Sequence, residues 1–206
     1  MALTTALFPL QLDIVSNIDG QSSHRGIEMT NKDTRAIAGE GACGDVLIVQ
    51  PGSSESYWQP VPANGSIDVI FAPHRVPMEH PIGFGTQTVP PGGYVREHAH
   101  DQNEEVIFVV SGKGRAVIDG ESHEMNPGSA FFIGKNRRHM FINEGETDIL
   151  WTWLIVPNGL EDFFRLIGRD RVDGEPAPEP FPRPENVLQI ERDTVFSAPP
   201  SDPYKV

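Results

Sequence analysis

Two histidines separated by one residue, His98 and His100, are the clearest chemical signal in the sequence. On a β-strand such a pair shares one face, because side chains alternate across the strand. Residues 101–103 form a turn-like break, and Glu105 then lies on a second alternating run. If the two strands pair as neighbours, the carboxylate lies beside the two imidazoles. That combination of ligands suits a first-row divalent transition metal.

An ordinary surface hairpin with two solvated histidines is the alternative interpretation, since unpaired histidines are often just polar surface residues. Three features favour the metal site. Glu105 lies at reachable spacing, Gly92 and Gly112 bracket the stretch, and a further histidine follows at His139. We therefore take a metal site as the working hypothesis.

The elements that must position these side chains are short strands. Apolar or alternating runs bounded by turn residues occur at 67–71, 83–89, 106–110, 115–118, 130–133, 139–143 and 149–156. Asp119-Gly120 between two such runs indicates a tight hairpin. Strands at this regular spacing, in a chain with 20 glycines and 19 prolines, predict an all-β sandwich or barrel. A further apolar run at 45–50 predicts a first strand.

One clear helix is expected after the strands. Asn158 is placed to cap it, and Glu161 three residues later completes a pattern like a capping box. Its apolar face, which we expect to pack on the barrel and which has substrate lining as its alternative role, consists of Leu160, Phe163, Phe164 and Ile167. Residues 174–184 form a proline-rich extended strap, and a short helix is expected over 185–192.

The stretch that contains the histidine pair resembles the first motif of the cupin superfamily, Gly-x5-His-x-His-x3-4-Glu-x6-Gly. Every position of that motif is occupied, by Gly92, His98, His100, Glu105 and Gly112. The resemblance implies that the two histidines and the glutamate bind one metal ion.

A second cupin motif, Gly-x5-Pro-x-Gly-x2-His-x3-Asn, is matched in part. Gly128, His139 and Asn143 fit it, whereas Gly134 replaces the proline and Asn136 replaces the second glycine. Asparagine tolerates a left-handed backbone better than most residues, so we expect the loop to keep its shape. The resemblance implies that the histidine of this motif supplies a third imidazole from a different strand.

The resemblance as a whole implies a cupin jelly-roll β-barrel over residues 66–157. Residues 1–65 are expected to form an N-terminal arm and first strands that pack on the barrel or on a partner subunit. Residues 158–206 are expected to form a C-terminal helix, a proline-rich strap and a tail. This C-terminal part also resembles the tails of quercetinase-type cupin dioxygenases, and those of cupins with no assigned activity.

The implied cofactor is one divalent transition metal ion per chain, with Fe(II) preferred and Mn, Ni, Co or Zn as alternatives. The predicted function is a dioxygenase that acts on a small enolic, phenolic or otherwise metal-chelating substrate, with Glu105 as catalytic base. The alternatives are an oxygen-independent lyase, isomerase, decarboxylase or cyclase, and a cupin that only binds a small molecule. The residues expected to line the substrate pocket are Ile107, Val109, Phe141, Asn143 and His80. Arg96, Arg137 and Arg138 lie near the motifs, either to hold a substrate carboxylate or as solvated surface charges.

Charge and composition exclude several other partners. The net charge is −13, from 16 basic and 29 acidic residues, which disfavours nucleic acid and anionic membrane surfaces. The single cysteine, Cys43, excludes an intrachain disulfide and fits a cytoplasmic location. We find no signal peptide and no apolar run long enough to span a membrane. By analogy with cupins, we expect a homodimer.

Overall fold

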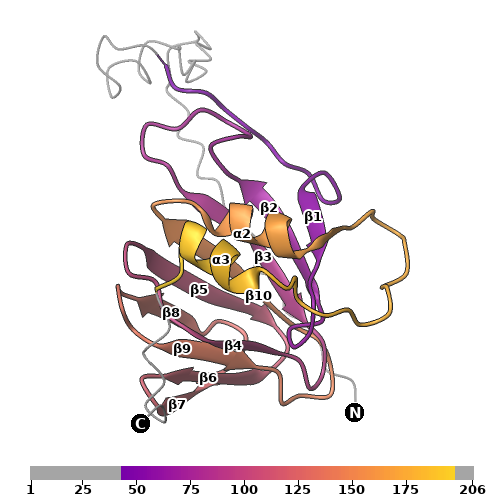
Figure 1. The fold of residues 1–206 in the computed structure, drawn as a ribbon. Helices are drawn as coiled ribbons and strands as arrows, with labels where there is room; N and C mark the ends of the chain where they lie inside the picture. Colours follow the sequence, from indigo (N-terminus) through magenta and orange to yellow (C-terminus); the bar gives the residue numbers. More distant parts are fainter. Residues whose placement is uncertain (1–42, 198–206) are drawn as a thin grey trace, which may run out of the picture. The chain divides into compact units, whose positions relative to one another are not determined.

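The computed structural model describes residues 43–197. Residues 1–42 of the predicted N-terminal arm, and most of the predicted tail, lie outside the described residues. Within the described part, the strands form two antiparallel sheets (Figure 1). The expectation of an all-β jelly-roll barrel with a short helical extension is confirmed.

The larger sheet has the strand order β11-β1-β2-β3-β10-β5-β8. Its strands are β1 (Glu55–Trp58), β2 (Ser66–Phe71), β3 (Gly83–Val89), β5 (Glu104–Ser111), β8 (Ala130–Ile133), β10 (Ile149–Val156) and β11 (Arg169–Asp170). The smaller sheet has the order β4-β9-β6-β7. Its strands are β4 (Tyr94–His98), β6 (Gly114–Ile118), β7 (Glu121–Met125) and β9 (His139–Ile142).

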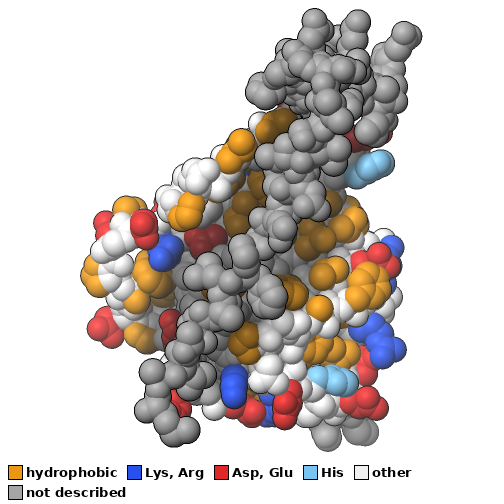
Figure 2. All heavy atoms as spheres, turned by 180° about the vertical axis from the view of Figure 1, so that it is seen from behind, with side chains coloured by type: hydrophobic (Ala, Val, Ile, Leu, Met, Phe, Trp, Pro, Cys, Tyr) orange, Lys and Arg blue, Asp and Glu red, His pale blue; other side chains and the backbone are white. Residues whose placement is uncertain are grey.

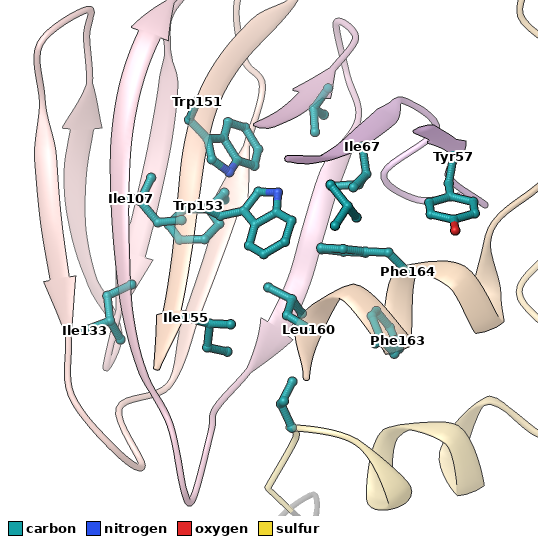
Figure 3. Close-up of a cluster of buried hydrophobic side chains, with 14 of the residues drawn as sticks. Tyr57, Ile67, Ile107, Ile133, Trp151, Trp153, Ile155, Leu160, Phe163 and Phe164 are labelled. Carbon is teal, nitrogen blue, oxygen red and sulfur yellow. The ribbon is translucent and has the colours of Figure 1, made fainter. Parts of the chain in front are cut away.

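The core lies on the inner face of the larger sheet, where side chains alternate between buried and exposed positions along β3, β5 and β10. Trp151 and Trp153 of β10 are almost fully buried there, next to Ile107 and Ile155 (Figure 3). Burying each large apolar side chain contributes roughly 1.5–3 kcal/mol, so this layer is a major source of stability.

The hairpin predicted at Asp119-Gly120 is confirmed. The backbone φ angles are 49° at Asp119 and 86° at Gly120, as a two-residue turn of the primed type requires. The turn joins β6 to β7, with Ile118 opposite Glu121.

Helices α2 (Leu160–Ile167) and α3 (Val187–Asp193) pack against each other, and α2 also contacts β3 (Figure 1). The predicted cap is shifted by one residue, because Gly159 and not Asn158 occupies the N-cap position. Glu161 fulfils half of the expected capping box, since its carboxylate accepts a hydrogen bond from the Gly159 N–H at 2.8 Å. Its other oxygen accepts one from the Asn158 amide.

The strand predicted over residues 45–50 is wrong, because this segment has no ladder partner within the described part of the chain. Val46 and Ile48, whose apolar character motivated the prediction, are largely exposed. Figure 2 shows one face of the molecule, on which hydrophobic side chains lie among charged ones. Among residues 43–197 no helix is long and apolar enough to cross a bilayer.

Candidate metal centre

Three histidines come together at one end of the smaller sheet. His98 is the last residue of β4 and lies directly opposite His139, the first residue of β9. His100 follows two residues after the end of β4. The sequence motifs therefore converge because the first and second motif strands are ladder neighbours.

Glu105 reaches this cluster from the larger sheet. The histidine strand and the glutamate strand are not neighbours, because β5 pairs with β8 and β10 while β4 pairs with β9. The carboxylate instead faces the imidazoles across the interior of the barrel. One ligand atom from each of His98, His100, Glu105 and His139 lies within 4.8 Å of the other three.

The hydrogen bonds of the three imidazoles fix which nitrogen is free. The Nδ1 of His98 lies 2.7 Å from the Arg96 carbonyl oxygen, and the Nδ1 of His139 lies 2.9 Å from that of Arg137. The Nδ1 of His100 lies 2.9 Å from the carbonyl oxygen of Val195. A carbonyl only accepts hydrogen bonds, so each Nδ1 carries the proton. In each neutral ring, Nε2 is then left with a lone pair, as in histidines that bind metals.

The atoms that face one another at the centre lack ordinary partners. His100, Glu105 and His139 are at most 4% exposed. Within residues 43–197, no hydrogen bond reaches the Nε2 of His100, the Nε2 of His139 or the Oε2 of Glu105. The Oε2 lies 3.1 Å from the His139 Nε2 and 3.8 Å from the His100 Nε2, but not in line for a hydrogen bond. Buried polar atoms without partners are costly, and a divalent cation would satisfy all of them. The residues therefore fit a metal ion.

Burial and neighbouring charges shift the pKa values of all four proposed ligands. Burial, with His139 and His100 nearby, holds the pKa of His98 well below its usual value. Burial also lowers the pKa of His100, against the opposing effect of Glu105. Burial alone would raise the pKa of Glu105, but the adjacent imidazole of His139 outweighs it and lowers that pKa. Burial alone would lower the pKa of His139, but the adjacent carboxylate of Glu105 outweighs it and raises that pKa. The site therefore presents an ionised carboxylate and two imidazoles that favour the neutral form, whereas His139 must release its proton when a cation binds.

The loop before His139 departs from the cupin motif but keeps the backbone that the motif requires. Asn136 adopts φ 61°, so the expectation that it tolerates a left-handed turn is confirmed. Its N–H donates a 2.7 Å hydrogen bond to the carbonyl oxygen of His100. This bond ties the second motif to the first and helps to position the second histidine of the pair.

A cavity opens from the cluster toward the helices. His98, Glu105 and Phe141 lie at its metal end. Its walls include the apolar face of α2, so that face both packs on the barrel, as predicted, and lines the cavity. Phe196 covers the cluster, with its ring centroid 5.2 Å from those of His98 and His100.

The predicted pocket residues have different positions. Phe141 lines the cavity. Ile107 and Val109 are core residues whose side chains do not reach its wall. The side-chain NH2 group of Asn143 donates hydrogen bonds to the carbonyl oxygens of Val89 and Thr147, and the residue does not line the cavity. His80 is exposed and lies outside the lining.

The three arginines near the motifs also differ in position. Arg96 lines the cavity, whereas Arg137 and Arg138 form surface ion pairs with Asp119 and Glu97. Sequence reasoning missed Gln59, Gln87, Arg183 and Phe196, which line the cavity from distant parts of the chain. Gln87 lies at an inward position of the alternating run at 83–89, which could have revealed it, whereas the other three belong to no motif or periodic pattern.

Comparison with known proteins agrees with this architecture. Residues 85–155 match the family model described as "Cupin domain". Two facing antiparallel sheets with a histidine and glutamate cluster between them thus define a cupin domain, and this chain carries one.

Curated relatives come from Streptomyces. The chain is 34% identical over 67 residues to "Protein SchB" of Streptomyces halstedii, covering 32% of this chain and 49% of that protein. It is 30% identical to "Polyketide synthase CurC" of Streptomyces cyaneus, over 36% of this chain and 49% of that protein. It is 27% identical to "Tetracenomycin polyketide synthase protein TcmJ" of Streptomyces glaucescens, over 60% of this chain and 78% of that protein. The matches span about half the length of the first two relatives.

Proposed function

We propose that this protein is a metal-dependent cyclase that closes rings in poly-β-carbonyl chains of the polyketide type, without consuming dioxygen. One observation carries the proposal. Three imidazoles, each with Nδ1 bound to a backbone carbonyl, direct their Nε2 lone pairs toward Glu105 at the end of an aromatic cavity. This arrangement suits a substrate that offers several oxygen atoms along a flat carbon skeleton.

The ligands proposed for the metal are His98, His100, Glu105 and His139. A bound divalent ion would act as a Lewis acid that polarises a substrate carbonyl and acidifies the neighbouring C–H. The identity of the ion stays a prediction, with Fe(II), Mn, Ni, Co and Zn all compatible with this ligand set.

Glu105 is the proposed proton acceptor. Its Oε2 is buried at the inner end of the cavity, and its lowered pKa keeps it ionised. A carboxylate held there can remove a proton from a carbon next to a substrate carbonyl. The resulting carbanion attacks a second carbonyl carbon of the same chain, and loss of one water molecule then gives the aromatic ring.

The cavity walls suit such a product. Phe141, Phe163 and Phe196 line the space beside the cluster, and aromatic side chains pack well against planar rings. Apolar walls also exclude water, which strengthens the electrostatic effect of the few polar groups inside. An extended chain that folds into this space brings its own carbonyls close together.

The names of two relatives support the class of substrate. Both CurC and TcmJ are described as polyketide synthase proteins. The dioxygenase function that we predicted from the sequence stays a prediction, because it needs the same ligands and differs only in whether dioxygen is consumed.

The test is an anaerobic assay with heptane-2,4,6-trione, which gives 3,5-dihydroxytoluene and one water molecule on aldol closure. We expect metal-loaded protein to form the ring product under strict anaerobiosis, as measured by chromatography. Metal-free protein and the His139→Ala variant serve as controls and should show only the background rate. Oxygen uptake on this or another enolic substrate, with no anaerobic product, would instead establish the dioxygenase.

A further inference from the structure

We infer that Gln59 and Gln87 form a second recognition site at the end of the cavity away from the metal centre. This site binds a neutral carbonyl or hydroxyl oxygen of the substrate. The inference rests on the proposed function, because it assumes that a substrate occupies this cavity with its other end at the metal. It adds the requirement that the substrate carries an uncharged oxygen far from the chelating edge.

Strand register places the two ends of the cavity apart. Gln87 of β3 lies opposite Trp151 of β10, which lies opposite Val109 of β5. Glu105 lies four residues before Val109 on the same strand. Two strand spacings of about 4.8 Å and four residues of about 3.3 Å separate the Cα atoms by roughly 16 Å on a flat sheet. The glutamines and the carboxylate are therefore two distinct polar sites on one inner face.

The two amides are buried but not fully used. Gln59 is 4% exposed and Gln87 is 6% exposed, and both line the cavity. The Nε2 of Gln87 donates a 2.7 Å hydrogen bond to the Oε1 of Gln59. No atom of residues 43–197 forms a hydrogen bond with the Nε2 of Gln59 or the Oε1 of Gln87. Exchanging oxygen and nitrogen in both amides leaves the same inventory, one free NH2 group and one free carbonyl oxygen.

The free donor and the free acceptor are not among the sealed polar atoms of the core, and both glutamines line the cavity, so a molecule in the cavity can bind them. The NH2 group matches a substrate carbonyl, and the free carbonyl oxygen matches a hydroxyl. A carboxylate is disfavoured at this point because the amides carry no charge. The guanidinium groups of Arg96 and Arg183, which also line the cavity, are both bound to Glu191.

The backbone does not need this side-chain pair to hold its register. The N–H of Gln59 already donates to the carbonyl oxygen of Gly65 at 2.8 Å. Strand β2 separates β1 from β3, with Ile67 paired to Gln87 on one side and to Tyr57 on the other. A role toward a ligand therefore accounts for the glutamines better than a role in strand pairing.

The test compares two probes, 1,8-dihydroxyanthraquinone and 1,8-dihydroxyanthrone, which differ only in the carbonyl oxygen opposite the chelating edge. Anaerobic absorbance titration of the metal-loaded full chain gives both dissociation constants. We expect the wild type to prefer the quinone by roughly tenfold, the factor that one neutral hydrogen bond supplies. In Gln59→Leu/Gln87→Leu the ratio should fall to about one, with metal content and thermal midpoint unchanged.

The exposed Gln102 offers a matched control, because Gln102→Leu makes the same chemical change on the surface and should keep the wild-type ratio. Should the double variant fail to fold, Gln87→Met measures the same ratio with an unbranched side chain. A ratio near one in the wild type, or a tenfold ratio that survives in the variant, would overturn the inference. Equal binding of both probes to metal-free and metal-loaded protein would overturn the proposed function instead.

Discussion

Removal of the segment Thr194–Ser197 should weaken metal binding, although none of its side chains belongs to the ligand set. The carbonyl oxygen of Val195 accepts the hydrogen bond from the Nδ1 of His100, and the N–H of Ser197 donates to the carbonyl oxygen of Ala99 at 2.8 Å. Without this segment, the imidazole of His100 loses the contact that fixes its tautomer and its orientation. Loss of such an orienting partner costs about 10- to 100-fold in metal affinity.

Folding stability should also fall in this variant. Val195 is only 4% exposed, and Phe196 packs on Phe163 with ring centroids 4.4 Å apart. Losing the burial of these two side chains and the two hydrogen bonds costs at most about 9 kcal/mol. The measurement is therefore made well below the thermal midpoint of each variant.

Two truncations make the comparison. A chain ending after Asp193 lacks the segment, whereas a chain ending after Ser197 keeps it and loses only residues 198–206. Competition with a chromophoric chelator gives the affinity of each for Zn²⁺ or Mn²⁺. Phe196→Ala removes the ring but keeps the carbonyl of Val195, so it should bind metal within a few-fold of the wild type. Equal metal affinity in the two truncations would refute the role assigned to the carbonyl, and an equal loss in Phe196→Ala would assign that role to the ring.

Three further predictions concern the centre and the turns. Glu105→Gln should retain metal on the three histidines but slow anaerobic ring closure by about 10²- to 10⁴-fold, as measured by product formation. In metal-free protein the partly buried His98 has a lowered pKa, so the unfolded chain binds one more proton than the folded chain as the pH falls below about 6.5. The wild type should therefore lose more unfolding free energy between about pH 7 and pH 5 than His98→Gln, as measured by urea titration. Gly120→Ala should cost about 1–2 kcal/mol from its φ of 86° alone, and Gly112→Ala should cost more because its Cβ would lie 2.3 Å from the Asp148 carbonyl oxygen, as thermal melts would show.

Motif spacing predicted which side chains gather, because the two cupin motifs encode donors at fixed positions along two strands. It did not predict that Glu105 would come from the opposite sheet. Strand pairing in a sandwich joins segments far apart in sequence, so adjacency along the chain is a poor guide to adjacency in a sheet. The left-handed backbone of Asn136 was predictable for a different reason, because asparagine tolerates a positive φ better than most residues.

Patterning also failed at the edges of the sheets. Strand β7 consists mostly of exposed polar residues, so it shows no apolar periodicity, although the turn before it revealed the hairpin. Residues 45–50 show the opposite error, because their apolar character predicts a strand that has no partner. Gln59, which follows the end of β1, and Gln87 of β3 lie far apart in the sequence and meet only because both strands join one sheet. No local signal marks such a pair.

The three carbonyls that hold the imidazoles belong to the main chain, and every amino acid supplies that group. Changes of side chain at Arg96, Arg137 or Val195 therefore leave the protonation pattern of the centre intact as long as the backbone keeps its course. The cavity walls, by contrast, consist of side chains that substitution alters directly. In evolution, a descendant of this protein could acquire a new substrate one wall residue at a time while inheriting the reactive end unchanged.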